Sequence, residues 1–248
     1  MKIIKKIFLK NKIYLFNYKK NSFFEGVYRF LAVIISPIFI KFNPNLISFL
    51  SLICGFFGLV SVTILDIKIQ YLIIFFFISF VLDFTDGLVA RYNMKSSFHG
   101  RFIDGLFDIF VIGFLHIVLL MYLLKFSNSE FKNLPLIFYL TTILIMPVQH
   151  LILDRFASLA RWCNQISKRK NIKPYYRNIF LNKFTMIFFD IQHFLLVYIL
   201  IFNDLNFSII VNLFFATSFI ASLFSIIIYI LLSKKNFNFI TNQKDNNE

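Results

Sequence analysis

Residues 83–91 read DFTDGLVAR, and Gly100, Asp104 and Asp108 follow them in a part of the chain that is otherwise almost wholly apolar. A carboxylate near the centre of a bilayer costs about 2.5 kcal/mol or more, so acidic residues in such segments are rare and usually functional. Four carboxylates close together need a cation to hold them, and a divalent metal ion is the simplest candidate. The four acids therefore predict a metal site within a membrane domain.

The spacing of the acids indicates that they share one site. Asp83 and Asp86 are three residues apart, and Asp104 and Asp108 are four apart. Each pair therefore lies on one face of a helix. The short polar turn at residues 92–100 allows two antiparallel helices to direct both pairs to the same point.

Small residues and an arginine accompany the acids. Gly87, Ala90 and Gly100 have almost no side chain, so they leave room for a flat group to approach the backbone. The forked guanidinium of Arg91 suits a phosphate group. Together with a metal ion, these residues indicate metal-assisted phosphoryl-type transfer.

The complete pattern, D-x2-D-G-x2-A-R-x8-G-x3-D-x3-D, resembles the signature of the CDP-alcohol phosphatidyltransferases, and the chain matches all eight fixed positions. A purely structural polar network between helices would not need glycine, alanine and arginine at these spacings as well. The resemblance implies an all-α integral membrane fold with six transmembrane helices around a polar cavity, open to the cytoplasm. It also implies a preceding amphipathic helix and a homodimer.

The composition agrees with a membrane protein. The chain has 248 residues, of which 58% are hydrophobic and only 15% are charged, and 37 are phenylalanine. A soluble domain could not bury that much apolar surface. A net charge of +14 would suggest nucleic acid in a soluble chain, but its distribution, given below, argues against that partner. Cys54 and Cys163 are far apart and predict neither a disulfide framework nor a metal site.

Six apolar segments are long enough to cross a bilayer, some with tilt. They lie at about residues 46–65, 70–86, 102–124, 134–153, 184–202 and 207–232. Before them, residues 26–42 are apolar but contain two basic residues and a proline, which favours a helix lying in the interface, with a true first span as the alternative. Pro44 precedes the first span, and Asn45 is predicted to cap it. We therefore divide the chain into a basic N-terminal segment (1–45), a six-helix catalytic domain (46–233) and a polar tail (234–248).

The basic residues predict the orientation of these spans. Twenty-three of the 26 lysines and arginines fall within residues 1–45, 91–101, 155–183 and the tail, and three fall in the intervening loops. Cytoplasmic loops are enriched in such residues. We therefore expect both termini and the active site on the cytoplasmic side of a bacterial inner membrane. The basic segments also favour anionic lipid head groups and anionic substrates.

The resemblance implies a reaction in which a CDP-linked alcohol, usually CDP-diacylglycerol, gives its phosphate-bearing alcohol to a hydroxyl acceptor and releases CMP. This is transferase chemistry of the EC 2.7.8 type, usually in phospholipid biosynthesis. By similarity, Asp83, Asp86, Asp104 and Asp108 would hold two Mg²⁺ or Mn²⁺ ions, and Asp108 would also be the general base. The positions that would receive the CDP group are Asn45, Gly87, Ala90, Arg91, Ser97 and Gly100.

The acceptor is left open by the sequence. The D-P-x-A-D-K form of the glycerol-phosphate branch is absent, while Ser97 to Gly100 and residues 158–164 look like partial versions of segments in membrane phosphatidylserine synthases. A sugar, a polyol or another small alcohol fits equally well, as does a non-lipid CDP-alcohol donor. The polar residues predicted to line the acceptor pocket, near the cytoplasmic ends of spans four and five, are Asp154, Arg155, Arg161, Lys183 and Asp190.

Two other classes of protein are compatible with intramembrane acids. An ion-coupled transporter would place them within internal repeats, but here the four acids lie in one half of the chain, with no counterpart in the last two spans. A degenerate family member acting as a scaffold would not need all eight fixed positions. Both alternatives are weaker than a transferase.

Overall fold

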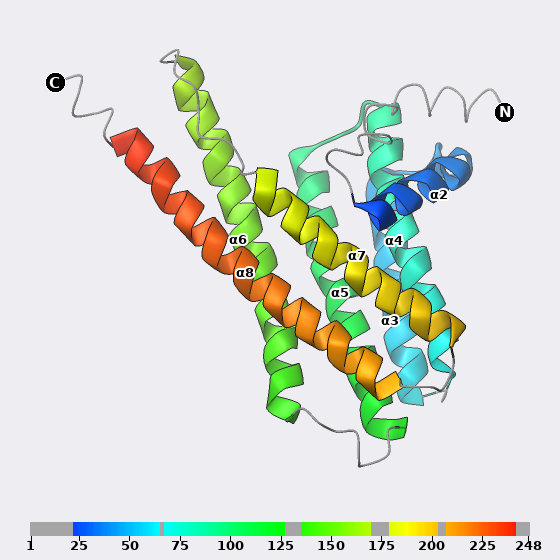
Figure 1. The fold of residues 1–248 in the computed structure, drawn as a ribbon. Coiled ribbons are helices and arrows are strands. Elements are labelled where there is room, and N and C mark those ends of the chain that lie inside the picture. The colour runs from blue at the N-terminus through cyan, green and yellow to red at the C-terminus, as the bar shows by residue number, and fades with distance from the viewer. Residues whose placement is uncertain (1–21, 65–66, 127–134, 170–178, 203–206, 242–248) are drawn as a thin grey trace.

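The computed structural model describes residues 22–64, 67–126, 135–169, 179–202 and 207–241, and the statements below concern these residues. The predicted basic residues within 1–21 and the end of the tail lie outside them. The described chain is all-α, as predicted, with no strand (Figure 1). Its helices are α2 (Phe23–Phe39), α3 (Pro44–Ile64), α4 (Ile69–Tyr92), α5 (Phe98–Phe126), α6 (Leu136–Arg169), α7 (Ile179–Ile201) and α8 (Phe207–Thr241).

Six of these helices are long and apolar enough to cross a membrane, which confirms the predicted number of spans. The candidate spans are Pro44–Ile64, Ile69–Tyr92, His99–Lys125, Leu136–Phe156, Lys183–Ile201 and Phe207–Lys234. Four helices continue past the predicted ends. α5 runs to Phe126 and α6 to Arg169, beyond the expected ends at 124 and 153. α4 runs on through residues 87–92, where Leu88 and Val89 are buried, and α8 runs to Thr241, so the start of the predicted tail is helical.

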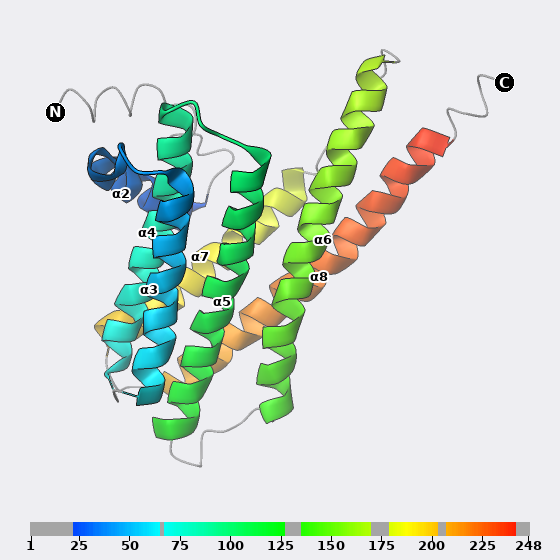
Figure 2. The same ribbon diagram turned by 180° about the vertical axis from the view of Figure 1, so that it is seen from behind.

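Helix α2 precedes the spans and lies across one end of α3 and α4 instead of running alongside them (Figures 1 and 2). It begins at Phe23, three residues before the predicted start, because Ser22 caps it by accepting a 3.1 Å hydrogen bond from the Glu25 N–H. Its inner face is buried, whereas Phe23 and Ile38 on the outer face are 62% and 70% exposed. This helix is therefore distinct from the six candidate spans, as predicted.

The start of α3 differs from the prediction in one residue. The cap is the side chain of Asn43, whose Oδ1 accepts a 3.1 Å hydrogen bond from the Asn45 N–H. Pro44 occupies the first helical position, where its missing N–H has no cost. Asn45 therefore lies inside the first turn, and its side chain is not the cap.

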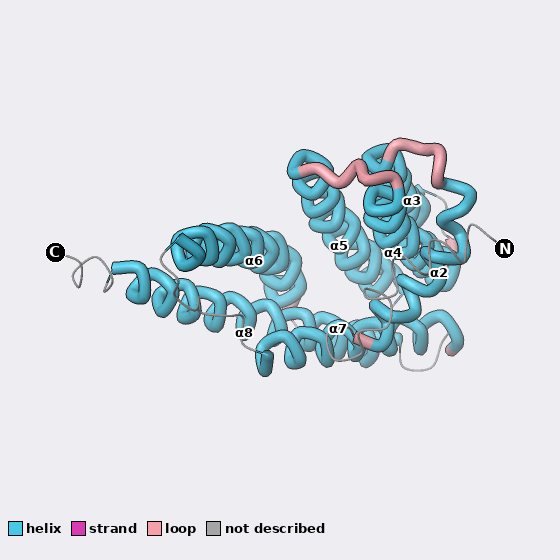
Figure 3. Tube along the Cα trace, turned by 90° about the horizontal axis from the view of Figure 1, so that it is seen from above, coloured by secondary structure: helices cyan, strands magenta, loops and turns pink. Residues whose placement is uncertain are grey.

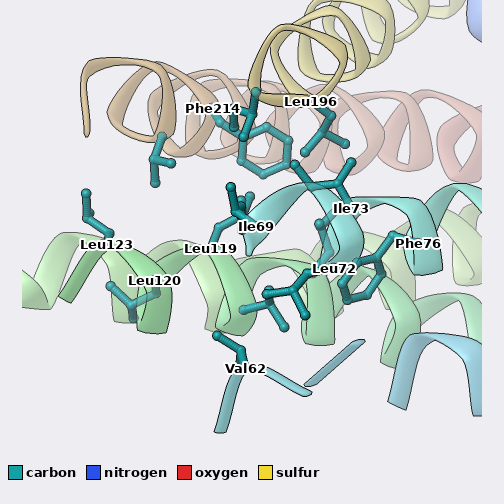
Figure 4. Packing of buried hydrophobic residues seen from close by; sticks show 14 of the residues in the cluster. Val62, Ile69, Leu72, Ile73, Phe76, Leu119, Leu120, Leu123, Leu196 and Phe214 are labelled. Carbon is teal, nitrogen blue, oxygen red and sulfur yellow. The ribbon is translucent and has the colours of Figure 1, made fainter. Parts of the chain in front are cut away.

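The bundle is held together by close helix contacts and a large apolar core. Ser51 on α3 and Ser79 on α4 each donate a hydrogen bond to the other's backbone carbonyl, at 2.9 and 2.8 Å. The core (Figure 4) combines residues of α3, α4, α5, α6, α7 and α8, including Val62, Ile69, Leu72, Ile73, Phe76, Leu119, Leu196 and Phe214. On α4 the core ends at Phe76, about 10 Å along the helix from Asp83. Apolar packing is thus concentrated towards the end opposite the acids.

The other helices are arranged around α3, α4 and α5. Seen from above, α6 and α8 lie together to one side, while α2 covers the other side (Figure 3). From the side, α6 and α8 lean away from α3–α5 towards the end at which α4 and α5 are joined (Figure 2). That end carries the predicted catalytic motif.

Two helical glycines allow a test of this packing. A Cβ on Gly58 would lie 2.9 Å from Cε2 of the buried Phe76 ring, whereas a Cβ on Gly113 of α5 would meet nothing within 4 Å. We expect Gly58→Ala to lower the melting temperature in detergent, because overpacking costs about 1–3 kcal/mol. Gly113→Ala should leave it unchanged or raise it, because alanine is the better helix former. Equal shifts in both variants would contradict this packing.

Candidate active site

The catalytic motif occupies the adjoining ends of α4 and α5. Asp83 and Asp86 lie in the last three turns of α4, and Asp104 and Asp108 lie in the first three turns of α5. The turn between the helices reverses the chain, because Met94 takes a left-handed conformation (φ 55°) and the Lys95 N–H returns to the Ala90 carbonyl at 2.9 Å. The predicted antiparallel arrangement of the two acid pairs is therefore confirmed.

The four carboxyl groups converge. One oxygen each from Asp83, Asp86 and Asp104 lies within 4.8 Å of the other two. Asp108 is within hydrogen-bonding reach of Asp83, and Asp104 is within reach of Asp86. The helix spacing alone predicts this cluster, since three- and four-residue separations place each pair on one face.

The cluster suits a hard divalent cation. All its donors are carboxylate oxygens, which Mg²⁺ and similar ions prefer. Like charges this close repel one another unless a cation or protons balance them. In addition, Oδ1 of Asp104 is buried and has no hydrogen-bond partner among the described residues. A buried acceptor without a partner is costly, and a metal ion would satisfy it.

Ser48 on α3 fixes one of the acids. Its buried hydroxyl donates a hydrogen bond to Oδ2 of Asp86, which is itself 4% exposed. The orientation of this carboxylate is thus set from a third helix. The sequence analysis did not single out Ser48, because its partner lies 38 residues away and cannot be derived from local spacing.

A cleft of about 400 Å³ opens beside the acids. Its lining comes from the start of α3, the end of α4, the connecting turn and the start of α5. All six positions predicted for the CDP group are among the lining residues, which are Pro44, Asn45, Ser48, Asp86, Gly87, Ala90, Arg91, Lys95, Ser96, Ser97, Gly100, Arg101 and Asp104. One end of the cleft is therefore acidic, and the rest is lined by hydroxyl, amide and cationic groups.

The two motif glycines in the cleft are tightly surrounded. A Cβ on Gly87 would lie 3.2 Å from Nη1 of Arg91, and a Cβ on Gly100 would lie 3.1 Å from Oγ of Ser97 and 3.3 Å from Oδ1 of Asn45. Any side chain there would push aside polar groups of the cleft. Ser97 also accepts a 2.9 Å hydrogen bond from the Gly100 N–H, so it caps α5.

Sequence reasoning missed three residues of the cleft. Lys95, Ser96 and Arg101 occupy variable positions of the motif, so the pattern itself gave them no weight. The available signal was charge, because two basic residues lie within six positions of each other next to the acids. With Arg91 they give the cleft three cationic side chains.

The residues predicted for an acceptor pocket are not brought to this cleft. Asp154 and Arg155 on α6 and Lys183 on α7 are exposed, and none of them lines it. Arg161 belongs to α6, but its side chain lies outside the described residues. Asp190 has another partner, because its two carboxylate oxygens accept hydrogen bonds from the first two N–H groups of α2.

Comparison with known proteins identifies the family. The sequence model described as CDP-alcohol phosphatidyltransferase matches residues 41–224, which begin just before α3 and end within α8. The matched region includes the four acids and the whole cleft lining. No individual curated protein matches the chain. Since the match extends over most of its length, the chain belongs to the CDP-alcohol phosphatidyltransferase family.

Proposed function

We propose that this protein transfers a phosphatidyl group from CDP-diacylglycerol to a hydroxyl acceptor and releases CMP. The observation that carries the proposal is a group of three carboxylates, with Asp108 beside Asp83, at the end of a cleft with three cationic side chains. Family membership supports transfer of a phosphate-linked alcohol from a CDP-alcohol. The choice of CDP-diacylglycerol follows from the membrane fold, which favours a donor with acyl chains in the bilayer.

The cleft suggests how the donor is held. The guanidinium of Arg91 and the side chains of Lys95 and Arg101 place positive charge along the wall, where a diphosphate would gain charge-assisted hydrogen bonds. Because a side chain at Gly87 or Gly100 would push aside Arg91, Ser97 or Asn45, the two glycines let these polar groups lie close to the backbone, where they could contact a nucleotide. Asn45 and Ser97 add an amide and a hydroxyl for polar contacts.

The acids would perform the chemistry. In the transfer, the acceptor oxygen forms a bond to the lipid-side phosphorus, the bond from that phosphorus to the CMP oxygen breaks, and the acceptor proton goes to a base. We assign the base to Asp108 and the metal-binding role to all four acids, Asp83, Asp86, Asp104 and Asp108. Two divalent ions bound there would supply charge stabilisation for the developing negative charge. Ser48 would keep the Asp86 carboxylate in place, and Arg91 would help to stabilise the phosphate oxygens of the leaving CMP.

Our proposal also covers the acceptor alcohol, the membrane in which the enzyme lies and its oligomeric state. A small alcohol such as serine is one candidate, and a sugar, a polyol or a non-lipid CDP-alcohol donor is the alternative, because the described part of the cleft does not distinguish them. We retain Asp154, Arg155, Arg161 and Lys183 as candidate acceptor-side residues and leave Asp190 out, since its carboxylate is engaged with α2. The excess of basic residues near the motif supports a cytoplasmic active site in a bacterial inner membrane. We further propose that the protein forms a homodimer. We also propose that its six-helix catalytic domain extends from residue 46 to residue 233.

Metal binding can be tested without any substrate. Mg²⁺ or Mn²⁺ should raise the melting temperature of the metal-free protein, because a ligand at a hundred times its Kd stabilises by about 2.7 kcal/mol. Asp104→Asn should melt higher than the parent protein without metal, since it removes one of the repelling charges, and should lose the rise on adding metal. Asp154→Asn, which changes an exposed acid on α6, is the matched control and should behave as the parent. An undiminished rise in Asp104→Asn would contradict the assignment.

Activity should follow the same residues. With purified protein, Mg²⁺ and CDP-diacylglycerol, CMP release should depend on one acceptor from a panel of serine, glycerol 3-phosphate, inositol phosphate, sugars and polyols. Asp108→Asn should reduce that release by about 10²–10⁴-fold, the usual contribution of a general base, and EDTA should stop it. Turnover that survives Asp108→Asn would refute the role of this residue. Release without dependence on any acceptor would instead indicate hydrolysis.

A further inference from the structure

Asp190 on α7 holds the N-terminus of α2. The backbone N–H groups of Phe23 and Phe24 donate hydrogen bonds of 2.9 Å to Oδ2 and Oδ1 of Asp190, respectively. The next two N–H groups of the helix donate to the side chain and the backbone of Ser22, each at 3.1 Å. The bond from Gly26 is the first ordinary helical hydrogen bond, so the N–H groups of Phe23, Phe24 and Glu25, which have no intrahelical partner, are all satisfied by side chains. Two of them are satisfied by one carboxylate about 167 residues away in the sequence.

This contact explains a charge in a membrane-spanning helix. Asp190 lies within the candidate span Lys183–Ile201, where an unpaired carboxylate would be costly. A helix N-terminus offers both N–H donors and the positive end of the helix dipole, so it stabilises a carboxylate without a basic side chain. The ring of Phe194, one turn further along α7, adds a stacked contact with Phe23 at 5.9 Å between centroids.

Helix α2 in turn packs against the back of the motif segment of α4. Ala32 and Val33 form a buried cluster with Leu88. The Tyr28 ring stacks on Phe84 at 6.0 Å between centroids, and the guanidinium carbon of Arg29 lies 5.2 Å from the centre of the same ring. These contacts are made on α4 between Asp83 and Arg91. The residues that α2 supports are thus interleaved in the sequence with those that form the metal site.

The other end of α2 is fixed to α4 itself. The side-chain amide of Asn93, directly after the last turn of α4, donates a 2.8 Å hydrogen bond to the carbonyl of Ile40 at the C-terminal end of α2. The helix is therefore anchored at both ends, to α7 through Asp190 and to α4 through Asn93. Because α2 is anchored at both ends, it restricts the movement of the motif segment of α4 that packs against it.

We propose that Asp190 is a positioning residue of this transferase. By fixing the start of α2 to α7, it holds α2 against α4 and so maintains the separation of Asp83 and Asp86 from the acids of α5. This role differs from the acceptor contact predicted from the sequence. Its link to the metal site rests on the proposed function, whereas the anchoring of α2 can be tested independently of it.

The anchoring is tested by a buried cysteine on α2. In a full-length chain with Cys54→Ser and Cys163→Ser, Ser36→Cys introduces a thiol of nearly the same size at a position that is 1% exposed. We expect Asp190→Ala to raise the rate of modification of this thiol by a water-soluble maleimide about tenfold, because the lost hydrogen bonds favour local opening. Asp190→Asn, which keeps one acceptor oxygen, should give a smaller increase and serves if the alanine variant does not fold.

The matched control is Gln192→Ala, two residues further along the same helix. The side-chain amide of Gln192 donates a 3.0 Å hydrogen bond to Ser218 on α8 and, among the described residues, forms no hydrogen bond with α2, so its removal should leave the labelling rate unchanged. Equal labelling in Asp190→Ala and the parent would overturn the anchoring. An equal increase in Gln192→Ala would show general loosening of α7 and would overturn it as well.

The coupling to the metal site is measured by the Mg²⁺ concentration that gives half of the maximal rise in melting temperature. We expect Asp190→Ala to raise that concentration about threefold or more, and Gln192→Ala to leave it unchanged. An unchanged concentration in Asp190→Ala would overturn the positioning role. If the parent protein itself shows no response to Mg²⁺ or Mn²⁺, the proposed metal chemistry fails, while the labelling experiment still decides whether Asp190 anchors α2.

Discussion

Mutual repulsion among four carboxylates inside a membrane domain is the constraint on which the rest of this structure depends. Each acid is costly to bury, and the cost grows when the acids converge. The chain meets it by bringing the acids to one point, where a doubly charged cation can balance them, and by fixing at least one of them with a neutral donor, Ser48. Positively charged side chains line the adjoining cleft. They belong to Arg91, Lys95 and Arg101, and they favour an anionic ligand. The acids therefore favour a divalent cation, and the basic residues beside them favour an anionic ligand.

Supporting such a cluster requires rigidity at the end of the bundle that lies away from the largest apolar core. The large core lies towards the opposite end of α4 and α5. Near the acids, its place is taken by specific polar contacts and by a crossing helix. Asp190 and Asn93 fix the two ends of that helix, and aromatic rings fill the space between. The polar cleft and the anchored helix α2 thus lie together at this end of the bundle, where a continuous apolar core would have closed the site.

The sequence predicted those features that arise from spacing along one helix. The six spans, the separate α2 helix and the meeting of the two acid pairs all follow from hydropathy and helical periodicity. Features that depend on distant partners were missed or misassigned. Asn45 was expected to cap α3, but Asn43 does so, because the asparagines on either side of Pro44 have similar capping propensities. The contact of Asp190 with α2 joins segments about 167 residues apart, and no local pattern reveals it. The acceptor residues could not be derived, since basic residues near the cytoplasmic ends of spans also serve as orientation signals.

One feature of the cleft bears on how such a protein can change over generations. Among the residues that the structure describes, its lining falls between Pro44 and Asp104 and comes from α3, α4, α5 and their connections. Mutations in the last three helices can therefore accumulate without altering the lining of the nucleotide cleft, apart from positions such as Asp190 that support it indirectly. With the donor held in this cleft as proposed, a lineage keeps its donor chemistry while the sequences of α6, α7 and α8 diverge. The segment from α3 to the start of α5 is then expected to change more slowly than the last three helices.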